Sequence, residues 1–308
     1  MDKCIVMLSS YNGENYIKEQ IDSILQQQGV DVQLYIRDDG SKDNTIEIVE
    51  KLMMVNSRIH LLKEENVGVT ASFKRLAEYI YMRDFDCQFY AFADQDDVWI
   101  SDKLQIAIEL LKKKQQQEPV LYYSNLKVVT NDLEYIFDRF DTAYVHNSKE
   151  SMLAEINVLG CTCVFNKSLL AEFAQSVFDM KIPHDAWIAL QAMFLGECIY
   201  DSSAHILYRQ HGNNESGQVV KGYQKLQSYL HKISQVKNMK RDYELFAVEF
   251  LKNYGDIINA SDKIKFLMLA EYRKSIKYRL KLLFTFSINS HHFLKEVSRR
   301  IRVIYGNL

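Results

Sequence analysis

The 308-residue sequence lacks several features that define common protein classes. Only two prolines and eleven glycines are present, so no long disordered linker is expected. The five cysteines are an odd number and include no Cys-x-x-Cys pair, which argues against a disulfide framework or a zinc site and suits a reducing cytoplasm. The first residues predict no signal peptide. No stretch reaches the run of about eighteen apolar residues that a membrane-spanning helix needs.

Several catalytic signatures are missing as well. The sequence has no Gly-x-Gly-x-x-Gly after its first apolar run, no Walker phosphate loop, no Gly-x-Ser-x-Gly elbow and no His-Glu-x-x-His helix. These absences disfavour nicotinamide chemistry, phosphoryl transfer from ATP, serine hydrolysis and zinc peptidase activity.

Short apolar runs alternate with amphipathic stretches along the first part of the chain. Strands are expected at residues 4–8, 32–36, 59–62, 89–93, 120–123, 158–165 and 204–209, and helices at 14–27, 43–54, 69–81, 102–113, 167–177 and from 183 onward. Strands that alternate with helices over short connections predict an α/β fold, with a mostly parallel, Rossmann-like sheet covered by helices on both faces. Beyond residue 222 the apolar spacing becomes wholly helical.

The net charge of −2 conceals an asymmetry between the two parts of the chain. Residues 1–217 carry 20 Lys and Arg against 33 Asp and Glu, whereas residues 218–308 carry 18 against 7. A split of this size indicates two regions with different partners. We therefore expect a catalytic domain over residues 1–217 and a basic, all-helical region over residues 218–308.

The apolar run Phe89–Ala93 ends in three carboxylates, Asp94, Asp96 and Asp97. Ligands of open α/β sheets bind at the carboxyl ends of strands, where this cluster is expected to lie. Carboxylates packed this closely repel one another unless a cation lies between them, and hard ions such as Mg²⁺ or Mn²⁺ favour such oxygen ligands. In an extended segment, Asp94 and Asp96 would point to the same side and reach one metal–diphosphate unit. The alternative is a solvated acidic turn before the next helix.

Two further polar loops follow expected strands directly. Asp39 lies in the turn that follows the second strand and could accept a hydrogen bond from a nucleobase imide, while Tyr11 packs on the ring and Ser9 contacts the ribose or base. The alternative is ordinary turn chemistry, because Asp and Gly are favoured in turns and Ser41 can cap a helix.

Residues near the end of the expected catalytic domain suggest a base and a phosphate partner. Asp185 follows Pro183 at the start of a helix, where a carboxylate either caps the helix or deprotonates an attacking hydroxyl. Trp187 could offer an apolar face to a sugar ring. Arg209 can neutralise a diphosphate leaving group, and His211 can complete a metal shell, although a lone histidine is more often structural.

Taken in order, these motifs resemble the family 2 inverting glycosyltransferases of the GT-A fold. The resemblance covers roughly residues 3–215 and is carried by Leu8-Ser9-Ser10-Tyr11-Asn12-Gly13, Asp38-Asp39-Gly40-Ser41, Asn66-Val67-Gly68, Asp94-Gln95-Asp96-Asp97-Val98-Trp99, Gly160-Cys161-Thr162, His184-Asp185-Ala186-Trp187 and Tyr208-Arg209-Gln210-His211. Within the family, the Asp-Gln-Asp-Asp-x-Trp motif at residues 94–99 and the Tyr-Arg-Gln-His motif at residues 208–211 resemble those of bacterial rhamnosyltransferases that build surface polysaccharides. One departure is Ser72, where relatives often carry Asn.

The resemblance implies a role for each matching residue. It implies nucleotide binding by Ser9, Tyr11, Asp39, Asp94 and Arg209, metal ligation by Asp96, Asp94 and His211, catalysis by Asp185 as base, and contact with acceptor or sugar by His184, Trp187 and Trp99. The implied cofactor is Mn²⁺ or Mg²⁺. The implied reaction moves a sugar, with L-rhamnose from dTDP-L-rhamnose as the best guess, onto a lipid-linked glycan with inversion. A UDP-hexose donor and a non-catalytic glycan-binding protein are the alternatives.

The basic C-terminal region, residues 218–308, shows a pattern that allows more than one interpretation. Basic and apolar residues interleave at helical spacing in Tyr272–Phe284 and again in Phe293–Tyr305. A solvated helical face is one interpretation, and helices on an anionic membrane surface at the inner face of the plasma membrane are the other. A homo-oligomer is a further possibility, and no recognised nucleic-acid module accompanies the charge.

Overall fold

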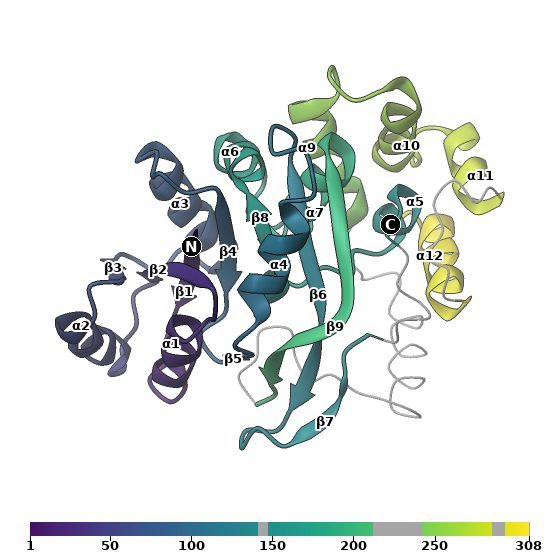
Figure 1. Cartoon of the computed structure of the whole chain (residues 1–308). Helices are drawn as coiled ribbons and strands as arrows, with labels where there is room; N and C mark the ends of the chain where they lie inside the picture. The colour runs from purple at the N-terminus through teal and green to yellow at the C-terminus, as the bar shows by residue number, and fades with distance from the viewer. Residues whose placement is uncertain (141–146, 212–241, 285–292, 308) are drawn as a thin grey trace. The chain divides into compact units, whose positions relative to one another are not determined.

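The computed structural model describes residues 1–140, 147–211, 242–284 and 293–307 (Figure 1). The chain divides into two units, each described separately below. The first unit comprises Met1–Thr142, Val158–Ser176 and Pro183–Gly212, and the second comprises Ala143–Asn157, Val177–Ile182 and Asn213–Leu308. The predicted boundary between residues 217 and 218 lies outside the described residues. No signal in the sequence indicated that 143–157 and 177–182 group with the C-terminal helices.

A mixed sheet forms the centre of the first unit, with strands in the order β3-β2-β1-β4-β8-β6-β9-β5 and β7 paired to β6. The strands are β1 Asp2–Ser10, β2 Val30–Asp38, β3 Ile59–Lys63, β4 Phe89–Ala93, β5 Val98–Trp99, β6 Val120–Val129, β7 Tyr135–Asp138, β8 Val164–Asn166 and β9 Glu197–Arg209. β4 is a fully buried apolar segment, β1 and β2 are mostly buried but carry polar residues near their ends, and β3 is partly exposed. The predicted α/β fold is confirmed.

The predicted parallel pairing holds for the first half of the sheet and for one later pair. β1 pairs in parallel with β2 and β4, β2 with β3, and β6 with β9. β8 is antiparallel to both of its neighbours, β4 and β6, and β5 is antiparallel to β9. The apolar pattern of a buried strand does not encode its direction, so the sequence could not distinguish these cases.

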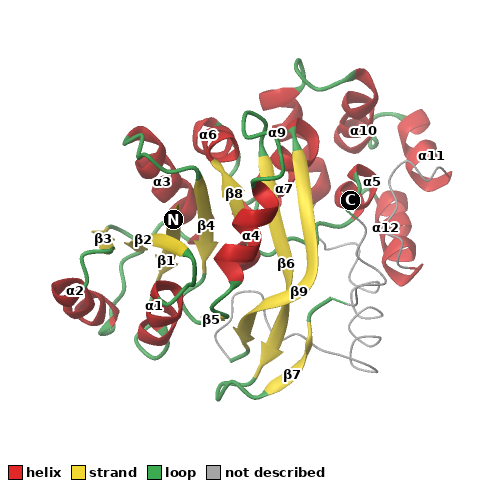
Figure 2. Ribbon diagram, viewed as in Figure 1, coloured by secondary structure: helices red, strands yellow, loops and turns green. Residues whose placement is uncertain are grey.

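Helices cover both faces of this sheet (Figure 2). They are α1 Ile17–Leu25, α2 Thr45–Val55, α3 Val69–Met82, α4 Lys103–Leu111, α6 Lys167–Gln175 and α7 His184–Leu195. α3, α6 and α7 pack against one another along one face, while α4 lies on the other face against β6, β8 and β9. α3, α4 and α6 each bury one face and leave the other more exposed, as their amphipathic sequences predict.

The apolar run 158–165 is not the single strand that the sequence predicted. Only its end belongs to β8, and Gly160–Thr162 form a short 3₁₀ turn, η2. The run is nevertheless buried. Periodicity cannot distinguish a buried strand from a buried turn, which explains the error.

The second unit is helical where the structure describes it. Its helices are α5 Lys149–Ala154, α9 Asp242–Tyr254, α10 Ala260–Glu271, α11 Ile276–Phe284 and α12 Phe293–Tyr305. Phe250 and Phe266 stack at 4.3 Å between α9 and α10, and Lys149 and Lys265 bond the buried Asp262. In the part of the chain that the structure describes, every helix is too short or too polar to cross a membrane.

Candidate active site

The carboxyl ends of β1, β2 and β4 bring three polar loops to one edge of the sheet. The register pairs Leu8 with Ala93 and Ser10 with Asp38, so the loops that follow start side by side. The loop after β1 and the loop after β4 are tied by two hydrogen bonds, from the Tyr11 N–H to Gln95 Oε1 and from Gln95 Nε2 to the Tyr11 carbonyl, both 2.9 Å. The predicted grouping of these loops is therefore present in the fold.

Asp39 is buried and held by a dense set of donors. Its Oδ1 accepts from Arg37 at 2.5 Å and from the Val67 N–H at 2.9 Å, and its Oδ2 accepts from the Gly68 N–H at 2.9 Å. The same Arg37 donates to Ser72, whose hydroxyl lies 2.6 Å from that of Ser9. Each carboxylate oxygen can accept two hydrogen bonds, so Oδ2 retains one acceptor position. The nucleobase role of Asp39 stays a prediction.

A cavity of about 480 Å³ lies beside Asp38 and Gly40, the two residues that flank Asp39 in the chain. It is lined by Tyr11, Asp38, Gly40, Lys42, Ile46, Lys63, Glu64, Glu65 and Asn66. Tyr11 is 47% exposed, which leaves an aromatic residue available to a ligand. Gly40 has a φ of +80°, so the turn after β2 uses a backbone conformation that favours glycine. The cavity is large enough for a small ligand of nucleoside size.

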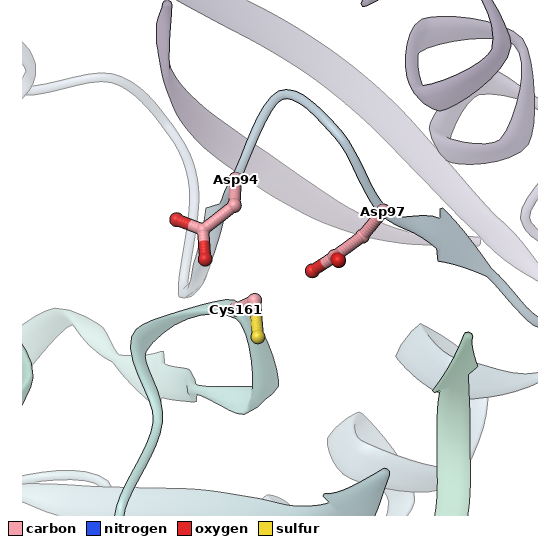
Figure 3. A group of neighbouring side chains, drawn as sticks. All are labelled: Asp94, Asp97 and Cys161. Carbon is pink, nitrogen blue, oxygen red and sulfur yellow. The ribbon is translucent and has the colours of Figure 1, made fainter. Parts of the chain in front are cut away.

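Three side chains converge beyond the end of β4, namely Asp94, Asp97 and Cys161 (Figure 3). Potential ligand atoms of the three lie within 4.8 Å of one another. Asp97 is fully buried, its Oδ1 accepts from the Arg209 N–H, and the Cys161 thiol interacts with its carboxylate. Burial, together with the charges of Asp96 and Asp94, raises the pKa of Asp97 well above its ordinary value.

The chemistry of this group fits a hard divalent cation. The carboxylates of Asp94 and Asp97 are the ligands that Mg²⁺ and Mn²⁺ prefer, and a cation between them would offset the repulsion between these closely packed carboxylates. A cysteine sulfur is a soft ligand, whereas Mg²⁺ and Mn²⁺ are hard ions that favour oxygen. We therefore regard Cys161 as a neighbour of the carboxylate pair rather than as a third ligand.

The pairing of carboxylates differs from the sequence prediction. Residues 94–97 form a bend instead of an extended segment, so Asp97, not Asp96, lies beside Asp94. The carboxylate of Asp96 instead accepts from His211 Nε2 at 2.8 Å, and the imidazole stacks on Tyr16 at 4.8 Å. Two residues predicted to share a metal thus contact each other. Their metal-ligand role stays a prediction.

Asp185 reaches the same region through η2. It is half-buried in the first turn of α7, and its Oδ2 accepts a hydrogen bond of 3.3 Å from the Gly160 N–H. Gly160 is followed by Cys161, which lies in the carboxylate group of Figure 3. A single short turn therefore connects the predicted base to the predicted metal site.

Arg209 is buried and bonded entirely to protein groups. Its guanidinium donates to the Glu19 carboxylate and the Asn131 carbonyl, and its Nε donates 3.0 Å to the Asp96 carbonyl. Arg209 as a whole residue is only 4% exposed. Arg209 thus stabilises the bend that carries Asp96, and its contact with a diphosphate stays a prediction.

The three residues predicted to contact acceptor or sugar are core residues instead. Trp187 is fully buried and donates from Nε1 to Ser176 Oγ at 2.9 Å, so neither face of its indole is open to a sugar. His184 is buried between Phe73, at 4.1 Å, and Phe92, at 5.3 Å, and burial lowers its pKa. These two predictions are corrected by the packing of α7 onto the sheet.

Trp99 is buried too, and it reveals a residue that the sequence analysis missed. Lys103 Nζ lies 3.5 Å from the centre of the Trp99 ring, is fully buried and has no hydrogen-bond partner among the described residues. Burial lowers the pKa of Lys103 to about 8. Interactions with the nearby Cys161, Cys4, Cys163 and Asp97 act in the opposite direction and raise this pKa. The third sugar-contact prediction is thereby corrected. No pattern in the sequence indicated that Lys103 is buried.

Comparison with known proteins identifies the family. The family described as "Glycosyl transferase family 2" matches residues 5–173 of this chain. The dTDP-rhamnosyl transferase RfbG of Shigella flexneri is 31% identical over 224 residues, which are 68% of this chain and 73% of that protein. The UDP-Glc:alpha-D-GlcNAc-diphosphoundecaprenol beta-1,3-glucosyltransferase WfgD of Escherichia coli is 31% identical over 185 residues, 60% of this chain and 68% of that protein.

A solved structure supports the fold. Residues 1–349 of TarS from S. aureus, in complex with UDP-GlcNAc, superpose with a TM-score of 0.58 at 15% sequence identity, covering 98% of this chain and 90% of that one. At this identity the likeness concerns the fold alone. The chain belongs to glycosyl transferase family 2, and its catalytic unit has the GT-A fold.

Proposed function

We propose that this glycosyltransferase moves one sugar from a nucleoside diphosphate donor to a hydroxyl of a lipid-linked glycan, with inversion at the anomeric carbon, in the synthesis of a bacterial surface polysaccharide. The observation that carries the proposal is the position of η2. Its Gly160 binds Asp185, and its Cys161 lies against Asp94 and Asp97. Two adjacent residues thus contact the proposed base on one side and a pair of carboxylates suited to a metal–diphosphate unit on the other.

The nucleoside part of the donor would occupy the cavity beside Tyr11. The exposed Tyr11 ring offers a surface on which a base can stack, and Asp39 Oδ2 retains an acceptor for the base imide N–H. Ser9 lies at the same strand end, hydrogen-bonded to Ser72. Arg37 fixes the Asp39 carboxylate, which would give the acceptor a defined direction.

The diphosphate would lie next to Asp94 and Asp97. These carboxylates fit a bound Mn²⁺ or Mg²⁺, which would supply positive charge to the departing nucleoside diphosphate. The pair Asp96–His211 and the guanidinium of Arg209 surround the same bend and would complete the polar wall. Burial of Asp97 excludes water from one side of the site, which strengthens every electrostatic interaction within it.

Asp185 would act as the base. Its carboxylate takes the proton of the acceptor hydroxyl, the resulting oxygen attacks the anomeric carbon, and the bond from that carbon to the diphosphate oxygen breaks. One displacement of this kind inverts the configuration. The Gly160 N–H holds Oδ2 of Asp185, so the carboxylate keeps a fixed orientation toward the acceptor.

L-rhamnose from dTDP-L-rhamnose is the proposed donor, and the support comes from RfbG, whose name specifies a dTDP-rhamnosyl transferase. WfgD, at the same identity over a shorter stretch, is named for UDP-Glc, so a UDP-hexose is the second candidate. The enzyme would work in the cytoplasm at the inner face of the plasma membrane, where lipid-linked acceptors of this kind are built, as a monomer or a homo-oligomer.

A thermal-shift panel tests the proposal. The protein is heated with dTDP-rhamnose, UDP-glucose, UDP-galactose, UDP-N-acetylglucosamine or GDP-mannose, each with and without Mn²⁺. A donor at about one hundred times its Kd stabilises the folded state by about 2.7 kcal/mol. We expect one donor to raise the melting temperature, and to do so only with metal. No shift with any donor would contradict the proposal.

A further inference from the structure

Helix α11 in the second unit exposes a stripe of large apolar side chains. Ile276 is 70% exposed, Leu280 47% and Phe284 74%. These residues are four positions apart, so they follow one another along one face of the helix. Leu282, on a different face, is only 1% exposed and anchors α11 to its own unit. The helix is therefore held by one side and leaves an apolar stripe outside.

Positive charge surrounds this stripe. The segment Tyr272–Phe284 contains five basic residues and no Asp or Glu. At about 100° per residue, Lys277 and Lys281 lie on one flank of the stripe and Arg279 on the other. Lys274 and Lys277 are exposed. An apolar stripe flanked by cations is the arrangement of a helix that lies in the interface of an anionic bilayer.

The charge pattern also selects the occupant. A second copy of the chain that packed its own α11 against this stripe would bring the same cations against these cations, and the like charges would repel. An anionic lipid surface instead offers acyl chains to the apolar residues and phosphates to the lysines. If nothing covered the stripe, three large apolar side chains in one row would face water. The surface chemistry thus favours lipid over another protein chain.

We propose that α11 docks this glycosyltransferase on an anionic membrane surface. Ile276, Leu280 and Phe284 insert at the level where headgroups meet acyl chains, and Lys274, Lys277 and Lys281 contact lipid phosphates. The inference deepens the proposed function and rests on it in one respect: a lipid-linked acceptor gives the enzyme a reason to work at a bilayer. It names the segment that makes the contact.

Vesicle flotation of the full chain tests the inference. The vesicles contain phosphatidylcholine alone, or phosphatidylcholine and phosphatidylglycerol in equal parts. One variant carries Ile276→Ser, Leu280→Ser and Phe284→Ser, and a second carries Lys274→Glu and Lys277→Glu. The matched control carries Met54→Ser, Val55→Ser and Met82→Ser, since these three side chains of the first unit are 84%, 84% and 76% exposed.

We expect the unmodified chain and the control to bind the anionic vesicles. The serine variant should bind at least about tenfold more weakly, because it loses the buried apolar area. Each Lys→Glu substitution should weaken vesicle binding by about fivefold or more. It should also reduce the dependence of that binding on salt concentration. Binding of phosphatidylcholine alone as strong as binding of the anionic mixture would overturn the inference.

Three other outcomes would overturn it as well. These are no binding of the unmodified chain to either vesicle, equal binding by the serine variant, and a dimer in solution that the serine substitutions dissociate. Thermal shift of the serine variant with donor and Mn²⁺ separates this inference from the proposed function. Donor stabilisation without lipid binding removes the docking role alone, whereas lipid binding without donor stabilisation removes the transferase role alone.

Discussion

The Gly160 N–H donates a hydrogen bond of 3.3 Å to Oδ2 of Asp185, and Gly160 also lies directly against Nε2 of His184. A Cβ added to Gly160 would lie only 2.5 Å from that nitrogen. The residue next to Gly160 is Cys161, which contacts the Asp94 and Asp97 group. Gly160 therefore fixes the distance between the proposed base and the proposed metal site.

We predict that Gly160→Ala impairs both folding and catalysis. The His184 ring is held between Phe73 and Phe92 and has no space into which it can move. Overpacking of this kind lowers the free energy of unfolding by about 1–3 kcal/mol. The transfer rate should fall more than the donor affinity, because Asp185 loses its orientation. Urea unfolding and a nucleotide-release assay measure the two effects.

A double-mutant cycle provides the control for this variant. His184→Ala removes the ring that the new methyl group would strike, so the double variant Gly160→Ala/His184→Ala should lose less stability than the two single losses together. Additive losses would show that the clash with His184 is not the cause.

We predict that Asp94 and Asp97 carry the response to metal. Mn²⁺ with donor should raise the melting temperature of the unmodified protein, and Asp94→Asn or Asp97→Asn should remove most of this rise, because a neutral amide binds a hard cation poorly. Asp86→Asn is a matched control, since that side chain is 98% exposed and its ion pair with Lys3 is a long one at 3.7 Å. An unchanged metal response in both variants would place the metal elsewhere.

We predict that Lys103→Met stabilises the protein near neutral pH. Burial lowers the pKa of Lys103 from 10.5 to about 8, so the folded state bears the cost of a buried charge. At about 1.36 kcal/mol for each unit of pKa, the shift corresponds to roughly 3 kcal/mol below pH 8. Methionine has a similar shape and no charge, so Lys103→Met should unfold at higher urea concentration at pH 7.

The stability difference between Lys103→Met and the unmodified protein should depend on pH. Between about pH 8 and 10.5 the unfolded chain holds a proton on Lys103 that the folded chain has released, so the contribution of Lys103 to the free energy of unfolding rises with pH. The advantage of Lys103→Met should therefore shrink across this range. Lys112→Met, at an exposed lysine paired with Asp2, serves as the control. A variant less stable than the unmodified protein at pH 7 would refute the prediction.

We predict that Trp187 acts through packing alone. Trp187→Phe loses the hydrogen bond to Ser176 and part of a buried ring, which should lower the free energy of unfolding by about 1–3 kcal/mol. Its KM for donor and acceptor should stay unchanged. An altered acceptor KM in Trp187→Phe would restore the sugar-contact role.

Tyr11→Ala should have the opposite effects. It should change the free energy of unfolding little, because the residue is exposed, but it should weaken donor binding, because base stacking on the ring contributes about 1–3 kcal/mol.

The sequence determined the strands that carry the site but not the bend between them. Phe89–Ala93 is predicted to the residue, because five buried apolar residues end in charged ones. The direction of each carboxylate depends on the backbone of residues 94–97, which local pattern does not specify. In the structure Asp97 lies beside Asp94, where the alternation of side chains in an extended strand had predicted Asp96.

The error over Trp187 has a different origin. Most side chains of α7 are buried on every face, as its almost continuous apolar sequence indicates. This signal was present and predicted a core helix, which leaves no ring for a sugar. The position of Cys161 and the burial of Lys103 depend on contacts between residues far apart in the chain, so sequence pattern alone could not reveal them.

The most direct test of the account compares Asp185→Asn with the unmodified enzyme. Both are incubated with radiolabelled donor, Mn²⁺ and bacterial membranes as the source of acceptor, and label in the lipid extract is counted while donor binding is followed by thermal shift. We predict that Asp185→Asn binds donor as the unmodified enzyme does and transfers at least about a hundredfold more slowly, because no carboxylate is left to accept the hydroxyl proton. Transfer at an unchanged rate by Asp185→Asn would contradict the assignment of the base.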